Sequence, residues 1–321
     1  MPKPLISIII PVFNGQKFLD RCFKTLELQN YNKLDIIFID NNSTDNTFKM
    51  LKEYSKKIYI RIFKCKNRGV SFARNEGLKW AEGEYLSFLD VDDEIHPEKF
   101  NILLELFSNY PSVKMAFGLT EKKYIDDNKN YILKLPYHEG LIQPPNCVHS
   151  LMKNLNHQPH ISSFLVKNKN VAKFPTFLNY GEDVAFLVKL SYEEDIAFTN
   201  KVVSIYHRHN ESAVSKSNSR QSPSERYLKF YKEFCLDSFF IKKNKNNHKK
   251  AFYLSELYTN KILFTLVKIE KNNNYISILN EHNKKYSTSY KIKLRIILFK
   301  NLPLKLAFKL FYYLNKIKLI K

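Results

Sequence analysis

Residues 1–215 of this 321-residue chain predict an α/β fold, in which a mostly parallel sheet is flanked by helices. Short apolar runs such as LISIIIP (5–11) and LDIIFID (34–40) are typical of strands buried on both faces. Segments with helical spacing of apolar residues follow these runs, as in residues 15–30. Repeated strand–helix units imply parallel strands joined by crossover helices, which is a Rossmann-like arrangement.

The expected elements follow one another along the chain. Strands are expected at 5–11, 34–40, 58–64, 85–90, 113–120 and 200–209, and helices at 15–30, 43–57, 71–83 and 181–192. Ser43 and Thr44 give a helix-start signal, and Gly83 would close the third helix. Residues 124–160 contain four prolines and no clear period, so we expect a long loop there.

A second, helical region is expected at residues 216–321. Ser222, Pro223 and Glu225 form a capping box that would start its first helix. The sequence therefore predicts two domains, with the boundary at about residue 215.

Positive charge is concentrated in this second region. Residues 211–321 carry 17 of the 21 net positive charges, and no acid occurs from His282 onward. Such a region attracts an anionic surface, either nucleic acid or lipid headgroups. No recognisable RNA- or DNA-binding module occurs in it, so we expect no nucleic-acid partner, and a nucleic-acid-binding protein is kept only as the alternative.

The last residues, 301–321, can form one further helix. Lys305, Lys309 and Lys316 share one face of it, and most other positions are apolar or aromatic. This pattern fits a helix lying in a membrane interface. It fits equally well a helix that packs within the C-terminal region with its lysines in water.

Cysteine use and apolar runs indicate the compartment. The cysteines are scattered and form no CxxC pair, which fits a reducing environment: Cys22, Cys65, Cys147 and Cys235. The N-terminal apolar run is broken at Pro11, so no signal peptide is expected, and no run is long enough to span a membrane. We expect a cytoplasmic protein, with peripheral binding to the inner face of the membrane.

Acidic residues crowd at the end of one predicted strand, in YLSFLDVDDEIHP (85–97). Asp90 and Asp92 point to the same side if the chain is extended. Asp40 and PVFN (11–14) also follow strands, and ligands of open parallel sheets bind at such strand ends. Paired carboxylates suit Mg²⁺ or Mn²⁺, which accept phosphate oxygens as further ligands. A metal-bridged diphosphate is therefore expected; the alternative is a solvated acidic turn.

Four stretches, in order, resemble family 2 glycosyltransferases with the GT-A fold. They are SIIIPVFNGQKFLDRCFKTLELQNY, IIFIDNNSTDNT, NRGVSFARNEGLKWAEGEYLSFLDVDD and GEDVAFLVKL, and the resemblance covers about residues 4–210. It implies an inverting, metal-dependent enzyme that moves a sugar from a nucleotide-sugar, usually UDP-linked, to a hydroxyl. The acceptor would be a glycan or a lipid-linked precursor, of the bacterial cell-surface polysaccharide or lipooligosaccharide type.

The resemblance also implies roles for single residues. The nucleotide-sugar would be bound by Pro11, Phe13, Asn14, Asp40, Asn41, Asn67, Gly69, Arg74, Asp90 and Arg208. The cofactor, Mn²⁺ or Mg²⁺, would be held by Asp92 and His209. Asn41 stands where the family often has Asp, which leaves the base specificity open. Asp93 and Glu94 are expected to be solvated or to lie behind the ligands.

A proton acceptor is needed as well, because a sugar hydroxyl is a weak nucleophile at neutral pH. The segment NYGED (179–183) places Glu182 and Asp183 at a helix start. The resemblance makes Asp183 the general base and Glu182 a residue that positions the base or the acceptor. The alternative is that both acids only stabilise the helix through its dipole.

Two further readings stay open within this framework. A nucleotidyltransferase would use the same metal but would not explain the GED segment. A non-catalytic GT-A scaffold is the other, and the presence of both Asp92 and Asp183 argues against it.

Overall fold

The computed structural model describes residues 3–124, 129–144, 146–153, 158–178 and 181–209, together with 298, 301–303, 306 and 310. The chain forms two compact units, Met1–Lys216 and Ser217–Lys321. The expected capping box at residues 222–225 and most of the 301–321 segment lie outside the described residues. In the part of the chain that is described, no helix combines the length and the hydrophobicity needed to cross a bilayer.

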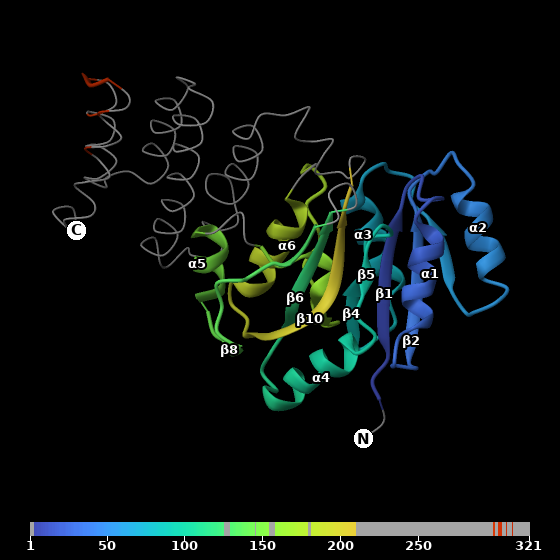
Figure 1. Ribbon diagram of the computed structural model, residues 1–321, viewed down its shortest axis with the longest axis horizontal. Helices are drawn as coiled ribbons and strands as arrows, with labels where there is room; N and C mark the ends of the chain where they lie inside the picture. The colour runs from blue at the N-terminus through green and yellow to red at the C-terminus, as the bar shows by residue number, and fades with distance from the viewer. Residues whose placement is uncertain are drawn as a thin grey trace. The chain divides into compact units, whose positions relative to one another are not determined.

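A mixed, mostly parallel sheet forms the centre of the first unit (Figure 1). Its described strands are β1 Ile6–Val12, β2 Leu34–Asp40, β3 Arg61–Lys64, β4 Tyr85–Phe88, β5 Glu94–Ile95, β6 Met115–Tyr124, β7 Lys129–Ile132, β8 Gly140–Ile142, β9 Phe164–Lys167 and β10 Ile196–Arg208. They are ordered β3-β2-β1-β4-β9-β6-β10-β5, with β7 beside β6 and β8 beside β10. Neighbours β3 to β4 run parallel, as do β6 and β10, whereas β9 is antiparallel to both β4 and β6. The predicted α/β class is confirmed.

Helices alternate with the strands in the first half of this unit. They are α1 Leu19–Glu27, α2 Thr47–Tyr54, α3 Val70–Trp80, α4 Lys99–Asn109, α5 Asn146–Lys153 and α6 Glu182–Ser191, with a 3₁₀ turn η1 at Ile161–Ser163. The predicted start of α2 at Ser43 is wrong by one turn, because Ser43 accepts a hydrogen bond from the backbone of Asn14 instead. Helix α3 ends at Trp80, before Gly83.

The long loop expected at 124–160 is also wrong. This stretch contains β7, β8 and α5, two of them very short edge strands. Strand β7 forms a local hairpin with β6, in which Tyr124 pairs with Lys129, whereas β8 depends on the distant strand β10. Strands of four and three residues carry too little periodicity to be seen in the sequence.

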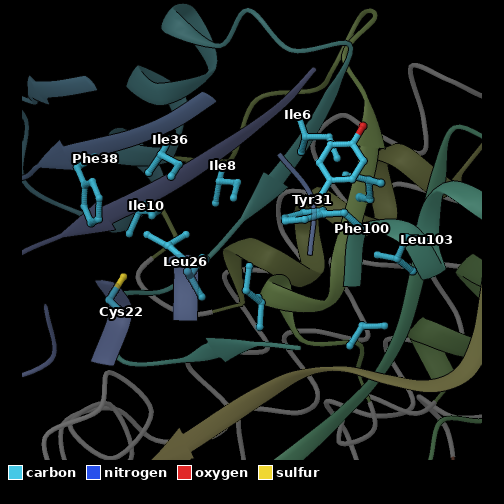
Figure 2. Packing of buried hydrophobic residues seen from close by; sticks show 14 of the residues in the cluster. Ile6, Ile8, Ile10, Cys22, Leu26, Tyr31, Ile36, Phe38, Phe100 and Leu103 are labelled. Atoms are coloured by element: carbon cyan, nitrogen blue, oxygen red, sulfur yellow. The ribbon is translucent and has the colours of Figure 1, made fainter. Parts of the chain in front are cut away.

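The apolar runs become strands because both faces of the sheet are covered. All seven residues of β1 are buried. Figure 2 shows Ile6, Ile8 and Ile10 on one face of β1, in the same cluster as Leu26 of α1 and Phe100 of α4. Burial on both faces accounts for a run with no polar alternation.

Two glycines allow close packing against β1. A Cβ on Gly83 would meet backbone atoms, at 2.8 Å from Tyr85 O and 2.9 Å from Leu5 O, and would also collide with the amide of Ser7. A Cβ on Gly77, in α3, would meet the side chain of Ile9 first. A side chain can move to make room for an added methyl group more easily than the backbone can. Gly77 should therefore tolerate alanine better than Gly83 does.

We therefore expect Gly83→Ala to lower the free energy of unfolding by about 1–3 kcal/mol, the usual range for overpacking. Gly77→Ala is the matched control and should cost less, because Ile9 can shift and alanine gains about 1 kcal/mol of helix propensity over glycine. Urea denaturation with an unchanged m-value measures both losses. An equal or larger loss for Gly77→Ala would contradict this account.

Candidate functional site

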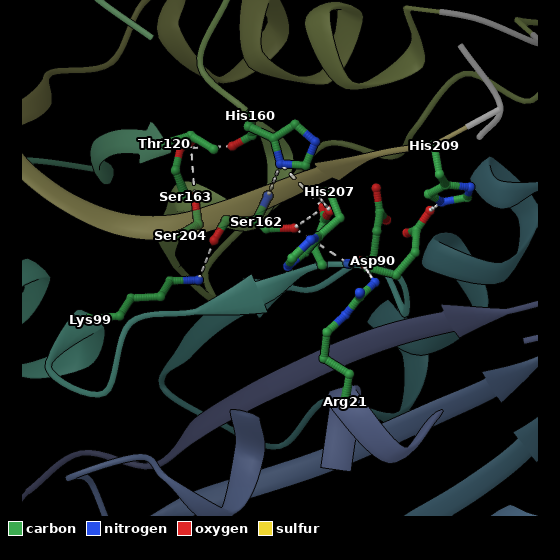
Figure 3. Close-up of polar contacts among 12 residues, drawn as sticks. Arg21, Asp90, Lys99, Thr120, His160, Ser162, Ser163, Ser204, His207 and His209 are labelled. Atoms are coloured by element: carbon green, nitrogen blue, oxygen red, sulfur yellow. Dashed lines mark hydrogen bonds and ion pairs between the residues drawn. The ribbon is translucent and has the colours of Figure 1, made fainter. Parts of the chain in front are cut away.

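The acidic loop follows β4, at the carboxyl end of the parallel strands. The amide of Leu89 still bonds the carbonyl of Ile9 at 3.1 Å, and the amide of Asp93 then closes a turn on the carbonyl of Asp90 at 2.9 Å. Arg21 of α1 donates to the carbonyl of Asp92 at 2.5 Å. The loop is therefore fixed at both its start and its middle; Figure 3 draws Arg21 and Asp90 together with the histidines of the site.

The two expected metal ligands lie together. Nε2 of His209 is 3.0 Å from the Oδ2 atom of Asp92, although 117 positions separate the residues. The two side chains are 12% and 24% exposed, and the His209 ring packs on Phe18 at 4.9 Å between centroids. This pair stays accessible to a ligand while its geometry is supported from behind.

Of the two expectations for Asp93, exposure to solvent is excluded and a place behind the ligands remains. Asp93 is fully buried: Oδ2 accepts from the Ser162 hydroxyl at 3.2 Å and Oδ1 from the His207 amide at 3.1 Å. Burial, with the nearby charges of Asp92 and Asp90, raises the pKa of Asp93 well above its usual value. Strand β10 covers Asp93 through the amide of His207, a contact that the sequence around Asp93 does not predict.

Glu94 is a hydrogen-bond partner of His207. Its Oε1 is 2.5 Å from Nε2 of His207. The hydrogen bond to His207 is the main cause that lowers the pKa of Glu94. The pair ties the acidic loop to β10.

A further group could hold a cation. Asp90, Asp93 and His160 each offer one ligand atom, and these atoms lie within 4.8 Å of one another. Burial lowers the pKa of His160 to about 4, so its imidazole is neutral, which is the form that binds metals. Carboxylate oxygens together with imidazole fit a divalent cation. His160 was not expected from the sequence, because it precedes η1 with no strand or spacing signal.

Arg74, the expected contact of the base or a phosphate, already has two carboxylate partners within the protein. Its side chain is only 2% exposed. Its two terminal nitrogens donate to Asp90 Oδ1 at 2.7 Å and to Glu182 Oε1 at 2.8 Å. Arg74 therefore joins the end of β4 to the start of α6.

The expected base lies at the first turn of α6. Gly181 caps this helix with a φ of 76°, a left-handed conformation that favours glycine. Burial, followed by the charge of Glu182, raises the pKa of Asp183 to about 7, although Arg74 acts in the opposite direction. A carboxylate that titrates near neutrality suits a general base.

Some of the residues expected to bind the nucleotide lie in or just after β1 and β2. Pro11 lies in β1 and is buried, and the next turn exposes the ring of Phe13 by 40%. The guanidinium of Arg68 lies 4.5 Å above that ring. Asn14 Oδ1 accepts from the amide of Thr44 at 2.8 Å, and its φ of 48° is tolerated by asparagine.

Asp40 is the last residue of β2 and Asn41 follows it, and both are buried. Asp40 Oδ1 accepts from the Ser43 amide at 3.1 Å. Asn41 donates to the carbonyl of Asn67 and accepts from the amide of Gly69, each at 2.6 Å. Both ends of its amide therefore hold the turn before α3, and its expected contact with the base stays a prediction.

Arg208 contacts a different part of the site from the two histidines that flank it in the sequence. Its Nη1 donates to the Tyr124 hydroxyl at 3.3 Å, and its guanidinium lies 5.4 Å from that ring centroid. His207 and His209 contact the acidic loop instead. Successive residues of a strand face opposite ways, so Arg208 and His207 lie on opposite faces of β10, and the expected phosphate contact of Arg208 stays a prediction.

Comparisons with known proteins find similar glycosyltransferases. The chain is 35% identical to the Escherichia coli glycosyltransferase YibD over 102 residues, which are 32% of this chain and 30% of YibD. It is 32% identical to E. coli chondroitin synthase over 130 residues, 40% of this chain and 19% of that protein. A Rickettsia typhi glycosyltransferase is 26% identical over 278 residues, 85% of this chain and 82% of that protein.

Solved structures share the fold. Residues 1–349 of Staphylococcus aureus TarS with UDP-GlcNAc superpose with a TM-score of 0.70, at 17% identity and over 98% of this chain and 92% of that one. A Pyrobaculum calidifontis mannosyltransferase with GDP-Man and Mn²⁺ gives 0.54, at 13% identity, over 96% and 86%. The sequence profile of glycosyl transferase family 2 matches residues 7–176, which is more than half of the chain. The chain therefore belongs to glycosyl transferase family 2 and has the GT-A fold.

Proposed function

We propose that this enzyme is an inverting, metal-dependent transferase that moves a sugar from a UDP-sugar to a hydroxyl of a cell-surface glycan precursor. The observation that carries the proposal is Asp183, a carboxylate with a pKa of about 7 beside Glu182 and Arg74. The UDP-GlcNAc complex of TarS and the name of chondroitin synthase support the donor and the kind of product.

Asp183 accepts the proton of the acceptor hydroxyl as that oxygen attacks the anomeric carbon. The bond from this carbon to the diphosphate breaks on the opposite side, and its electron pair leaves with UDP. Attack and departure on opposite sides invert the anomeric centre, so an α-linked donor gives a β-linked product. Glu182, held by Arg74 at 2.8 Å, keeps the first turn of α6 in place.

The residues present fit a divalent cation, and Asp92 with His209 would hold it. Their oxygen and nitrogen are 3.0 Å apart and both side chains remain partly exposed. In Asp93, by contrast, both carboxyl oxygens already accept hydrogen bonds inside the protein. When bound, Mn²⁺ or Mg²⁺ would neutralise the negative charge that grows on the diphosphate.

The basic region at residues 211–321 would bring the enzyme to its acceptor. Its 17 net positive charges would bind anionic lipid at the inner face of the cytoplasmic membrane. A lipid-linked acceptor would then be within reach of a cytoplasmic enzyme.

Asp183→Asn should reduce kcat by about 10²–10⁴-fold, the usual contribution of a general base, and leave UDP affinity unchanged. For the wild type, kcat/KM should rise with pH through about 7, because only the ionised carboxylate accepts a proton and its pKa is about 7. Released UDP and isothermal titration measure the two quantities. Transfer by Asp183→Asn at near wild-type rate would remove Asp183 as the base.

Asp92→Asn should abolish the Mn²⁺-dependent part of UDP binding, because it removes the accessible ligand of the pair. Asp93→Asn is the matched control: it changes the neighbouring, buried acid and should leave metal-dependent binding within about threefold. Titration of UDP with and without Mn²⁺ tests both variants. The opposite ranking would assign the metal to the group of Asp90, Asp93 and His160.

A further inference from the structure

One face of β6, β7 and β10 carries a row of tyrosines and cations. Strand register places Lys122 between Tyr206 on β10 and Tyr131 on β7, and places Tyr124 beside Arg208. Residues paired directly across neighbouring strands point to the same face of a sheet. These five side chains, Lys122, Tyr124, Tyr131, Tyr206 and Arg208, form what we call the tyrosine–cation strip.

The members of the strip contact one another. The rings of Tyr124 and Tyr131 are stacked, with centroids 5.7 Å apart and hydroxyls at 2.9 Å. Nζ of Lys122 lies 5.6 Å from the centroid of Tyr206. The Tyr131 side chain is 44% exposed and the other four are partly exposed, so the strip is an ordered surface that a ligand can reach.

The charge on this face is positive. Glu121 and Lys123 alternate to the other face, where Glu94 pairs with His207. Among the described residues, neither Lys122 nor Arg208 has a carboxylate partner within 4.0 Å. Burial, and then the charge of Arg208 in addition, lowers the pKa of Lys122. Two cations are thus held near each other with tyrosines between them, an arrangement that an anion would stabilise.

The strip begins next to the acidic loop. The Tyr206 ring packs on His160 at 4.7 Å between centroids, and His160 lies 3.6 Å from the carboxylate of Asp93. In the sheet order, β4 and Asp90 separate the strip on β6 and β10 from the expected nucleotide residues on β1 and β2. The strip therefore occupies the side of the reaction centre away from the donor.

We propose that the tyrosine–cation strip binds the acceptor, and that this acceptor is an anionic saccharide bearing phosphate or carboxylate groups. Tyrosine rings offer flat, rigid surface for the apolar faces of sugar rings and hydroxyls for hydrogen bonds. Arginine and lysine pair with phosphate and carboxylate, arginine by two parallel hydrogen bonds. The inference rests on the proposed function, because only a transferase needs an acceptor here.

The test compares three probes on the full chain loaded with UDP: a uronic-acid oligosaccharide, a glycerol-phosphate oligomer and neutral maltohexaose. Calorimetric titration should show that at least one anionic probe binds about tenfold more tightly than the neutral one. Whichever anionic probe binds more tightly identifies the charged group as carboxylate or phosphate. Equal affinity for neutral and anionic probes, or no binding of either anionic probe, would overturn the proposal.

Variants locate the binding on the strip. Lys122→Gln should weaken the anionic probe about tenfold, and Tyr131→Ala about threefold, with UDP affinity unchanged. The matched control Lys79→Gln removes one charge from an exposed position on α3 and should change neither. A loss of UDP affinity in the strip variant would assign the strip to the donor. If UDP does not bind the wild type at all, the proposed function itself fails, which is a separate result.

Discussion

The buried guanidinium of Arg74 is the contact on which the site depends. It bonds Asp90 at the end of β4 and Glu182 at the start of α6, residues that no direct hydrogen bond joins. Burying a cation is costly unless its partners are close and well oriented, and removing one member of such a group leaves an uncompensated charge. Arg74 thereby fixes the distance between the acidic loop and the helix that carries Asp183.

The same contact separates the roles of two neighbouring acids. Glu182 accepts from Arg74 and keeps a permanent partner. Burial, and then the charge of Glu182, raise the pKa of Asp183 to about 7, although Arg74 acts in the opposite direction. Asp183 can therefore exchange a proton near neutral pH. The GED segment thus both starts α6 and carries Asp183, the proposed general base.

Local patterns were enough to predict β1, β2 and the crossover helices, since a strand that is buried on both faces is a continuous apolar run in the sequence. They also brought Asp92, His209 and Asp183 to attention through the family motifs. They could not show that Asp93 is buried, because its partners Ser162 and His207 are 69 and 114 positions away. The contact of Arg74 with Glu182 and the short strand β8 likewise depend on residues distant in the sequence.

Strand β10 imposes the last constraint, because its two faces serve different purposes. His207 contacts the acidic loop, while Tyr206 and Arg208 belong to the tyrosine–cation strip. A slip of one residue would exchange these faces. The register against β6 shifts twice between Phe198 and Ser204, and the buried hydroxyls of Ser204 and Thr120 then bond at 2.9 Å. This bond fixes the register of β10 just before Tyr206, His207 and Arg208. The register shifts are therefore confined to the irregular stretch before Ser204, and each of the three side chains stays on its own face.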